Sequence, residues 1–153
     1  MHSPYQLRQE RTALANWIAE DGYTHAITLN TDRELSSPRL KMIFSNFCHR
    51  FDKALHGGRN MKRMPTELRL RAIAFPENLS TNAHLHVSAD FSTAVEFMGD
   101  EGSVMTLART CWLQATRGAG SFYHEPAPDA NWGRYCMKRF NGDYFLSSEF
   151  FPS

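Results

Sequence analysis

Two strand-like segments separated by a short, turn-rich stretch constrain the fold of this chain most. Residues 66–75 read TELRLRAIAF, residues 83–91 read AHLHVSADF, and PENLSTN lies between them at residues 76–82. A turn of this length and composition joins two strands as a hairpin, so the strands are adjacent and antiparallel. We therefore predict a β-hairpin in the middle of the sequence.

Helices and further strands surround this hairpin. The helix over residues 36–58 is the clearest, because a serine cap and Pro38 begin it, Gly57 ends it, and apolar residues recur every three or four positions. Hairpin-linked strands and helices of this size predict an α+β fold, a central antiparallel sheet of about five strands with flanking helices. The pattern predicts further helices over residues 5–21, 103–116 and 129–142, and further strands over residues 23–31, 120–126 and 143–151.

Composition is that of a single globular domain over residues 1–153, with 42% hydrophobic and 22% charged residues. The sequence has no run of about 18 apolar residues, which a membrane-spanning helix would need. The N-terminal segment MHSPYQLRQERTALANW has no apolar signal-peptide centre. The three cysteines show no CxxC spacing and are interpreted as reduced thiols. We expect a cytoplasmic protein without a membrane partner.

Charge is uneven along the chain although the net charge is only +1. Residues 39–71 contain nine lysines and arginines against Asp52 and Glu67, whereas residues 72–130 are acidic. The basic segment is either a solvated face or a strip that contacts phosphates. The predicted DNA-binding residues of this segment are Arg39, Lys41, Arg50, Arg59, Lys62, Arg63, Arg69 and Arg71.

His84 and His86 lie one residue apart in the second hairpin strand. Residues two apart in a strand share a face, so these histidines project together, while Leu85, Val87 and Ala89 take the core face. The strand pattern therefore predicts that the imidazoles are displayed side by side, close enough to share one metal ion.

Glu77 supplies a third candidate metal ligand at the end of the first hairpin strand. If the turn closes the hairpin, Glu77 falls opposite His84 across the ladder. Two neutral imidazoles and a carboxylate leave coordination positions open for water and a phosphate oxygen. Other enzymes with an H-x-H pair fit less well, because a cupin, an amidohydrolase barrel and a two-histidine phosphoesterase each need residues or length that this chain lacks.

Tyr135 and Lys138 are spaced three apart in WGRYCMKRF, residues 132–140, on the last predicted helix. Trp132, Cys136 and Phe140 form the adjacent apolar stripe. The alternative interpretation is a packing tyrosine and a solvated lysine. Tyrosine, whose unperturbed pKa is about 10, becomes a usable nucleophile when a nearby cation favours its phenolate form. Tyr123 is the competing nucleophile, although no lysine follows it at that spacing.

The order of these motifs resembles that of the HUH endonuclease superfamily, the single-tyrosine replication initiators of rolling-circle elements and their viral and transposon relatives. AITLNT at residues 26–31 looks like the first motif of that family. The hairpin with Glu77, His84 and His86 looks like its metal site, and Tyr135 with Lys138 looks like its Y-x-x-K helix. The resemblance extends from about residue 23 to residue 150.

This resemblance implies a Mg²⁺- or Mn²⁺-dependent endonuclease. It would nick single-stranded DNA, such as a hairpin at an origin, and transfer the cut strand. Tyr135 would attack the scissile phosphate and remain joined to the 5′-phosphate, and Lys138 would steady the phenolate or the phosphate. The family fold is a central antiparallel sheet, ferredoxin-like or RRM-like, that carries the histidines. Two alternatives stay open: a non-catalytic module that binds single-stranded nucleic acid on the same fold, and a scaffold that binds neither metal nor nucleic acid.

Overall fold

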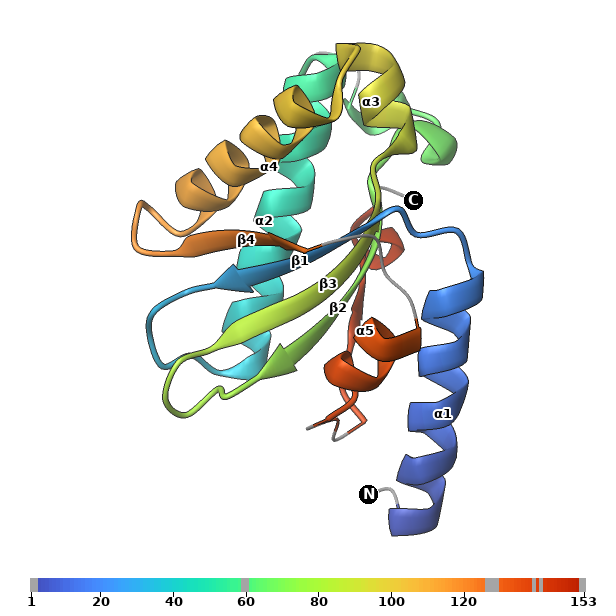
Figure 1. Ribbon diagram of the computed structural model, residues 1–153. Helices are drawn as coiled ribbons and strands as arrows, with labels where there is room; N and C mark the ends of the chain where they lie inside the picture. The colour runs from blue at the N-terminus through green and yellow to red at the C-terminus, as the bar shows by residue number, and fades with distance from the viewer. Residues whose placement is uncertain (1–2, 59–60, 126–129, 139, 141, 152–153) are drawn as a thin grey trace.

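A five-stranded antiparallel sheet forms the centre of the protein, as predicted (Figure 1). The computed structural model describes residues 3–58, 61–125, 130–138, 140 and 142–151. The order across the sheet is β4-β1-β3-β2-β5. The strands are β1 (His25–Asn30), β2 (Arg71–Glu77), β3 (His84–Asp90), β4 (Ser121–Glu125) and β5 (Phe145–Leu146). The predicted hairpin is β2–β3 and occupies the middle of the sheet.

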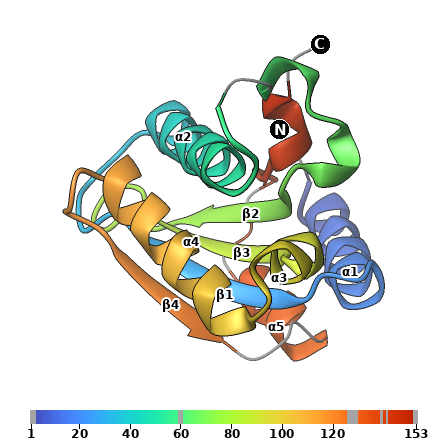
Figure 2. The same ribbon diagram turned by 90° about the horizontal axis from the view of Figure 1, so that it is seen from above.

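Helices cover both faces of this sheet, giving three layers (Figure 2). Two long helices, α2 (Ser37–His56) and α4 (Glu101–Ala115), lie side by side on one face, with the short α3 (Ser92–Met98) before α4. On the other face, α1 (Pro4–Glu20) packs against α5 (Ala130–Cys136). None of the described helices is long and apolar enough to cross a membrane.

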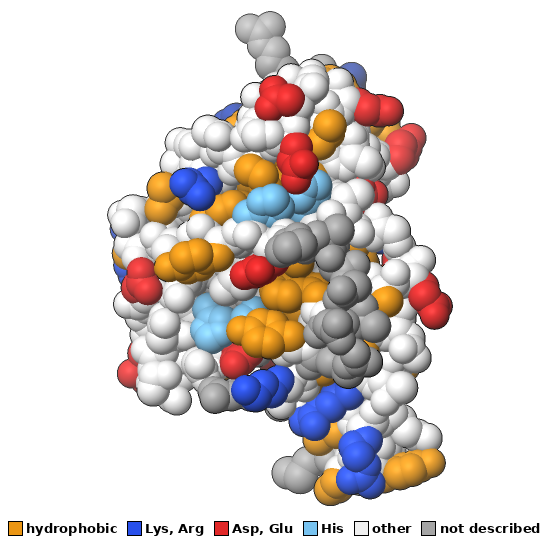
Figure 3. Space-filling model, in the orientation of Figure 1, with side chains coloured by type: hydrophobic (Ala, Val, Ile, Leu, Met, Phe, Trp, Pro, Cys, Tyr) orange, Lys and Arg blue, Asp and Glu red, His pale blue; other side chains and the backbone are white. Residues whose placement is uncertain are grey.

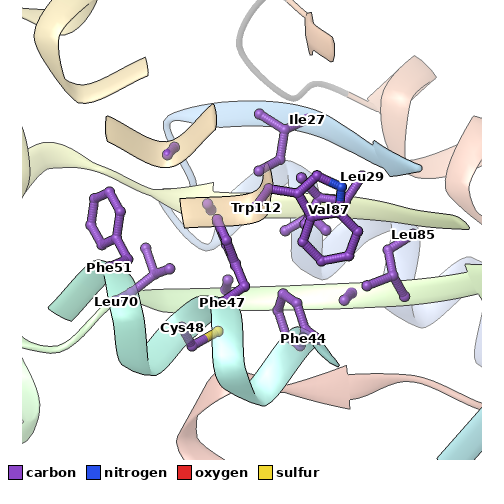
Figure 4. Close-up of a cluster of buried hydrophobic side chains, with 14 of the residues drawn as sticks. Ile27, Leu29, Phe44, Phe47, Cys48, Phe51, Leu70, Leu85, Val87 and Trp112 are labelled. Carbon is purple, nitrogen blue, oxygen red and sulfur yellow. The ribbon is translucent and has the colours of Figure 1, made fainter. Parts of the chain in front are cut away.

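Helix α2 begins and ends where the sequence predicts. The Ser36 side chain accepts a hydrogen bond from the Arg39 N–H, and Gly57 ends the helix with a positive φ of 87°. Its apolar stripe includes Phe44, Phe47 and Phe51, which are buried with Trp112 of α4 against one face of the sheet (Figure 4). These aromatic rings are part of the larger core and pack α2 against the sheet.

A smaller core fills the space under α1 and α5. Ile73 and Phe75 of β2 meet Ile18 of α1 and Cys136 of α5 there. These β2 residues alternate with Ala72 and Ala74, which face the larger core. Both faces of the hairpin are therefore covered, which buries side chains that a one-sided sheet would leave exposed.

Several elements differ from the prediction. The first hairpin strand, predicted over residues 66–75, begins only at Arg71, because Thr66–Leu68 form a 3-10 helix. Residues 92–98 form α3, which was not predicted, and the predicted helix over 103–116 begins two residues earlier. The predicted last strand over 143–151 exists but is too long: only Phe145–Leu146 pair with β2, because the 3-10 helix Ser147–Phe150 ends the extended chain. The predicted helix over 129–142 is also too long, since α5 ends at Cys136; the expected cap Asp129 lies outside the described residues.

Candidate metal centre and nucleophile

The β2–β3 hairpin brings Glu77, His84 and His86 together as predicted. Glu77 pairs directly with His84, and all three side chains share the face of the sheet under α1 and α5. Glu77 Oε2 lies 2.8 Å from His86 Nε2 and 3.9 Å from His84 Nε2. The three ligand atoms lie within 4.8 Å of one another, which is close enough for one ion to contact all of them.

Hydrogen bonds turn each imidazole so that its Nε2 faces Glu77. His84 Nδ1 lies 2.9 Å from the carbonyl oxygen of Asn82, which can only accept, so in the neutral ring Nδ1 holds the proton and Nε2 has a free lone pair. His86 Nδ1 lies 3.4 Å from the hydroxyl of Thr28, its direct neighbour on β1. Partners of this kind orient metal-binding histidines and raise their basicity. Thr28 belongs to the AITLNT strand, which gives that motif a physical role.

His86 is buried, which corrects the prediction that both histidines are displayed on an open face. The His86 side chain is only 4% exposed, whereas those of His84 and Glu77 are each 13% exposed. Burial lowers the pKa of His86 below its ordinary value, although the Glu77 carboxylate beside it favours the imidazolium. The neutral ring that a metal ion needs is therefore favoured near neutral pH.

Helix α5 supplies the cover over His86. The Tyr135 ring meets the His86 ring with centroids 4.8 Å apart, and the Trp132 ring meets His86 at 5.7 Å. Trp132 also stacks on Tyr135 and donates a hydrogen bond from Nε1 to Ser88 Oγ of β3 at 3.0 Å. Tyr135 remains 52% exposed. The ring of Tyr135 is thus held beside His86 while the residue stays open to solvent.

Lys138 occupies a different setting from the predicted one. Because α5 ends at Cys136, Lys138 lies in the following turn, where its N–H donates to the carbonyl oxygen of Tyr135 at 3.2 Å. Its side chain is exposed. The expected helical face shared by Tyr135 and Lys138 was therefore wrong, although the two residues remain adjacent through this turn.

Tyr123, the competing nucleophile, lies on the same face of the sheet. It pairs with Thr28, which in turn pairs with His86, so a single cross-strand row contains all three. Two strand spacings separate the backbones of Tyr123 and His86 by about 10 Å. The Tyr123 side chain is 57% exposed. The backbone of Tyr123 thus lies two strands away from His86, whereas the Tyr135 ring contacts His86 directly.

Four of the predicted DNA-binding residues have partners within the protein, including Arg50, whose Nε donates a hydrogen bond to Asn46 Oδ1 at 2.5 Å. Arg71 forms ion pairs with Asp21 at 2.8 Å and with Asp90 at 3.4 Å. Arg69 is buried and donates to the carbonyl oxygens of Met61 and Met64, and Lys41 pairs with Glu149 at 2.7 Å. These cations contribute to the fold whether or not they also attract phosphate.

The other predicted cations that the structure describes do not form one continuous strip. Lys62 and Arg63 are on the 3-10 helix Met61–Arg63, beyond the C-terminus of α2, and Arg59 lies outside the described residues. Arg39 is near the N-terminus of the 20-residue α2, about 30 Å from that end. The basic segment is thus spread along a whole helix.

Arg39 and Arg50 instead share an open hollow of about 430 Å³ with Arg33 and Arg117. Thr31 also lines it, next to the end of β1 that pairs with His84. The last two arginines were missed by the sequence analysis because they lie outside the basic segment. Arg33 precedes α2 and Arg117 follows α4, so the sequence does not indicate that both line the same hollow.

A second group of two histidines and a glutamate was also missed. His25, Glu101 and His124 place one ligand atom each within 4.8 Å of the others. They come from β1, α4 and β4, so no local motif connects them. Figure 3 shows histidine side chains gathered at two separate places on one side of the molecule.

Comparisons with protein-family models, with curated proteins and with solved structures give no match. Function is therefore inferred from the residues that the fold brings together. Of those residues, the hairpin ligands Glu77, His84 and His86 and the adjacent Tyr135 form one contiguous group on one face of the sheet.

Proposed function

We propose that this protein is a metal-dependent endonuclease that nicks and rejoins single-stranded DNA through a covalent tyrosine intermediate, in the manner of the HUH superfamily that its sequence resembles. The observation that carries the proposal is the contact between Tyr135 and His86, with ring centroids 4.8 Å apart. Tyr135 lies beside three candidate metal ligands and is 52% exposed, so a DNA strand held at those ligands could reach it. Cytoplasmic location is part of the proposal, because it would give access to DNA.

The donor set fits a divalent ion. Glu77 offers one carboxylate oxygen, and His84 and His86 each offer Nε2, with their Nδ1 atoms engaged by Asn82 O and Thr28 Oγ1. Mn²⁺ and Mg²⁺ are the ions expected from the resemblance, and the two nitrogen donors favour Mn²⁺ of this pair, because Mg²⁺ prefers oxygen ligands. A bound ion would polarise the scissile phosphate and stabilise its developing charge.

The protein's own contribution is mainly positioning. Trp132 stacks on Tyr135 from one side, and His86 contacts the ring from another, so the phenol has restricted freedom. In the proposed reaction the Tyr135 oxygen loses its proton to solvent and bonds to phosphorus. The phosphorus–O3′ bond breaks, and the leaving 3′ oxygen gains a proton. Attack by a 3′-hydroxyl reverses these steps and rejoins the strand.

Single-stranded DNA would reach this site over the end of the sheet. The hollow lined by Arg33, Arg39, Arg50 and Arg117 borders that end, at Thr31. Guanidinium groups attract phosphates, and the exposed rings of Tyr123 and Tyr135 offer surfaces on which bases stack. These features also suit the alternative, a module that binds single-stranded nucleic acid without cleaving it.

Formation of a covalent adduct separates these possibilities. The protein is mixed with a pool of random single-stranded DNA and Mn²⁺, boiled in detergent, and resolved on a denaturing gel. We expect an adduct that Tyr135→Phe abolishes while DNA binding stays within about twofold of the parent protein, because only one hydroxyl is removed. Tyr123→Phe is the matched control and should retain the adduct.

Each other outcome assigns a different mechanism. Loss of the adduct in Tyr123→Phe but not in Tyr135→Phe would make Tyr123 the nucleophile. Cleavage without an adduct, leaving a free 5′-phosphate, would indicate that water attacks and would reject the tyrosine mechanism. Binding with no cleavage of any strand in the pool would favour the non-catalytic module.

A further inference from the structure

His25, Glu101 and His124 form a compact group on the opposite face of the sheet from the proposed metal centre. His25 Nε2 lies 2.8 Å from Glu101 Oε1, and His124 Nε2 lies 3.8 Å from the same oxygen. Ligands around a four-coordinate zinc ion, each about 2.0–2.1 Å from the metal, lie about 3.4 Å apart. The two observed separations bracket this value, so small side-chain rotations would bring all three donors onto one ion.

The two groups of ligands are independent. His25 pairs with Ala89 and His124 pairs with Ile27, both of which face the core under α2 and α4. His84 pairs instead with Asn30 at the other end of β1, about 17 Å along the strand. An ion at one group therefore cannot also contact the other, and each can be removed separately.

Thr24 is placed to support His25 as a metal ligand. Its Oγ1 lies 2.7 Å from His25 Nδ1 and accepts a hydrogen bond from the Phe91 N–H at 2.9 Å. If the hydroxyl donates to the Ala89 carbonyl oxygen, 3.3 Å away, Oγ1 can also accept from a protonated Nδ1. His25 Nε2 then has a free lone pair directed at Glu101. Rotation of one hydroxyl proton is enough to prepare this tautomer, without backbone movement.

We propose that His25, Glu101 and His124 bind a divalent transition-metal ion of the zinc type. Two imidazoles and one carboxylate are donors that zinc accepts readily. The His25 side chain is 10% exposed, whereas those of His124 and Glu101 are 36% and 58% exposed. The ion is anchored on one buried ligand and open to solvent, which leaves at least one position for water.

This ion would cross-link three elements of the fold. His25 begins β1, His124 lies on the edge strand β4, and Glu101 is the first residue of α4. β4 pairs with β1 alone among the described strands. Binding to the folded protein but not to the unfolded chain raises stability in proportion to the logarithm of the ion concentration. We expect saturating Zn²⁺ to raise the unfolding temperature by several degrees.

Metal stoichiometry in variants tests the proposal. The full chain is titrated with Zn²⁺ and with Co²⁺, whose visible absorption reports nitrogen and oxygen coordination. The His84→Ala/His86→Ala double variant should bind one ion and keep its thermal shift. Adding His124→Ala to this double variant should remove both the bound ion and the thermal shift. Adding Glu101→Gln instead, which keeps the size of the side chain, should weaken Zn²⁺ binding at least tenfold. His49→Ala, at an exposed histidine outside both groups, is the matched control and should change nothing.

Failure of this proposal can be distinguished from failure of the proposed endonuclease, because the readouts are metal content and stability. If the His84→Ala/His86→Ala variant folds and binds no Zn²⁺, the second site does not exist, and His25 simply donates a hydrogen bond from Nε2 to Glu101. If that variant does not fold, His124→Ala alone decides: the number of bound ions should fall by one, whether or not the hairpin group also binds Zn²⁺. An unchanged number would overturn the proposal.

Discussion

The ring of Tyr135 lies edge-on to the ring of His86, with an interplanar angle of 63° and centroids 4.8 Å apart. The two residues belong to α5 and β3, and α5 has only seven residues. A helix this short is not stable by itself, so its packing against the sheet and against α1 determines where the Tyr135 phenol lies. The proposed nucleophile therefore depends on packing contacts some distance from the metal ligands.

Gly133 provides one of these contacts, and we predict that Gly133→Ala displaces α5. A Cβ atom at this position would lie 2.9 Å from the carbonyl oxygen of Ala15 and 3.0 Å from its Cα, both backbone atoms of α1. The two helices must separate to admit it, at a cost of about 1–3 kcal/mol. We expect a lower unfolding free energy in urea and a slower formation of the DNA adduct, with Mn²⁺ affinity nearly unchanged.

Gly102→Ala is the matched control for this substitution. Gly102 is also a helical glycine, but the nearest atom to its added Cβ is a side-chain oxygen of Asp100 at 3.3 Å. Alanine favours the helix over glycine by up to about 1 kcal/mol, so this variant should be neutral or slightly more stable. Equal loss of stability in both variants would show that close packing at Gly133 is not the cause.

Thr28 gives a second prediction, since its hydroxyl orients the buried imidazole of His86. Thr28→Val keeps the shape of the side chain and removes the group that lies 3.4 Å from His86 Nδ1. Loss of such a partner lowers metal affinity by about 10- to 100-fold in known sites, and the long contact here favours the lower end. Calorimetric titration with Mn²⁺ measures the change. Thr106→Val, at an exposed position on α4, should leave the affinity unaltered.

The hairpin and the grouping of Glu77, His84 and His86 on it could be predicted from sequence because both are local. Glu77 and His84 are seven residues apart, and the two-residue period of a strand places His84 and His86 on one face whatever surrounds them. The ends of α2 were predictable for the same reason, since Ser36 and Gly57 act through neighbouring backbone groups. Local rules were sufficient wherever the determining atoms were a few residues apart.

Features that depend on distant segments could not be predicted in this way. His86 is buried by Trp132 and Tyr135, which come more than 40 residues later in the chain. The alternation of β3 contains no information about which helix covers its second face. Arg71 likewise appeared available for DNA. In the structure it forms ion pairs with Asp21, which precedes β1 in the sequence, and with Asp90 at the end of β3.

The arginine hollow leads to a prediction about salt. Arg39→Gln and Arg50→Gln together should weaken single-stranded DNA binding and flatten its salt dependence. Each phosphate contact on a single strand contributes about 0.7 to the slope of log affinity against log salt, so the double variant should lose about 1.4 if both residues touch phosphate. Fluorescence anisotropy at several salt concentrations measures this slope.

Arg71→Gln is the informative comparison for that experiment. Its guanidinium already pairs with Asp21 and Asp90 and lies 4.2 Å from the centre of the Tyr23 ring. We expect this variant to lose stability while its salt slope stays near that of the parent. A larger fall in slope for Arg71→Gln than for the double variant would place the phosphate contacts at the other end of the sheet.

Asp52 gives the last prediction, on the pH dependence of stability. Its carboxylate is buried on α2 and accepts a hydrogen bond from the Leu70 N–H at 2.8 Å, just before β2 begins. Burial raises the pKa of Asp52 to about 6, although the Leu70 N–H and the Arg69 guanidinium oppose the rise. The folded protein thus holds this proton more tightly than the unfolded chain, in which an aspartate has a pKa of about 3.9.

The sign of the effect follows from this difference in proton binding. The stabilisation from protonated Asp52 is complete below about pH 4, is lost as pH rises through about 6, and changes little above that value. A difference of about two pKa units corresponds to about 3 kcal/mol. Asp52→Asn keeps an oxygen that can accept the hydrogen bond from the Leu70 N–H, and it cannot ionise. The unfolding free energy of this variant, measured in urea, should therefore not show this fall between pH 4 and 7. The exposed Asp32→Asn makes the same chemical change and should follow the parent curve; if Asp52→Asn follows it too, Asp52 has an ordinary pKa in the folded protein.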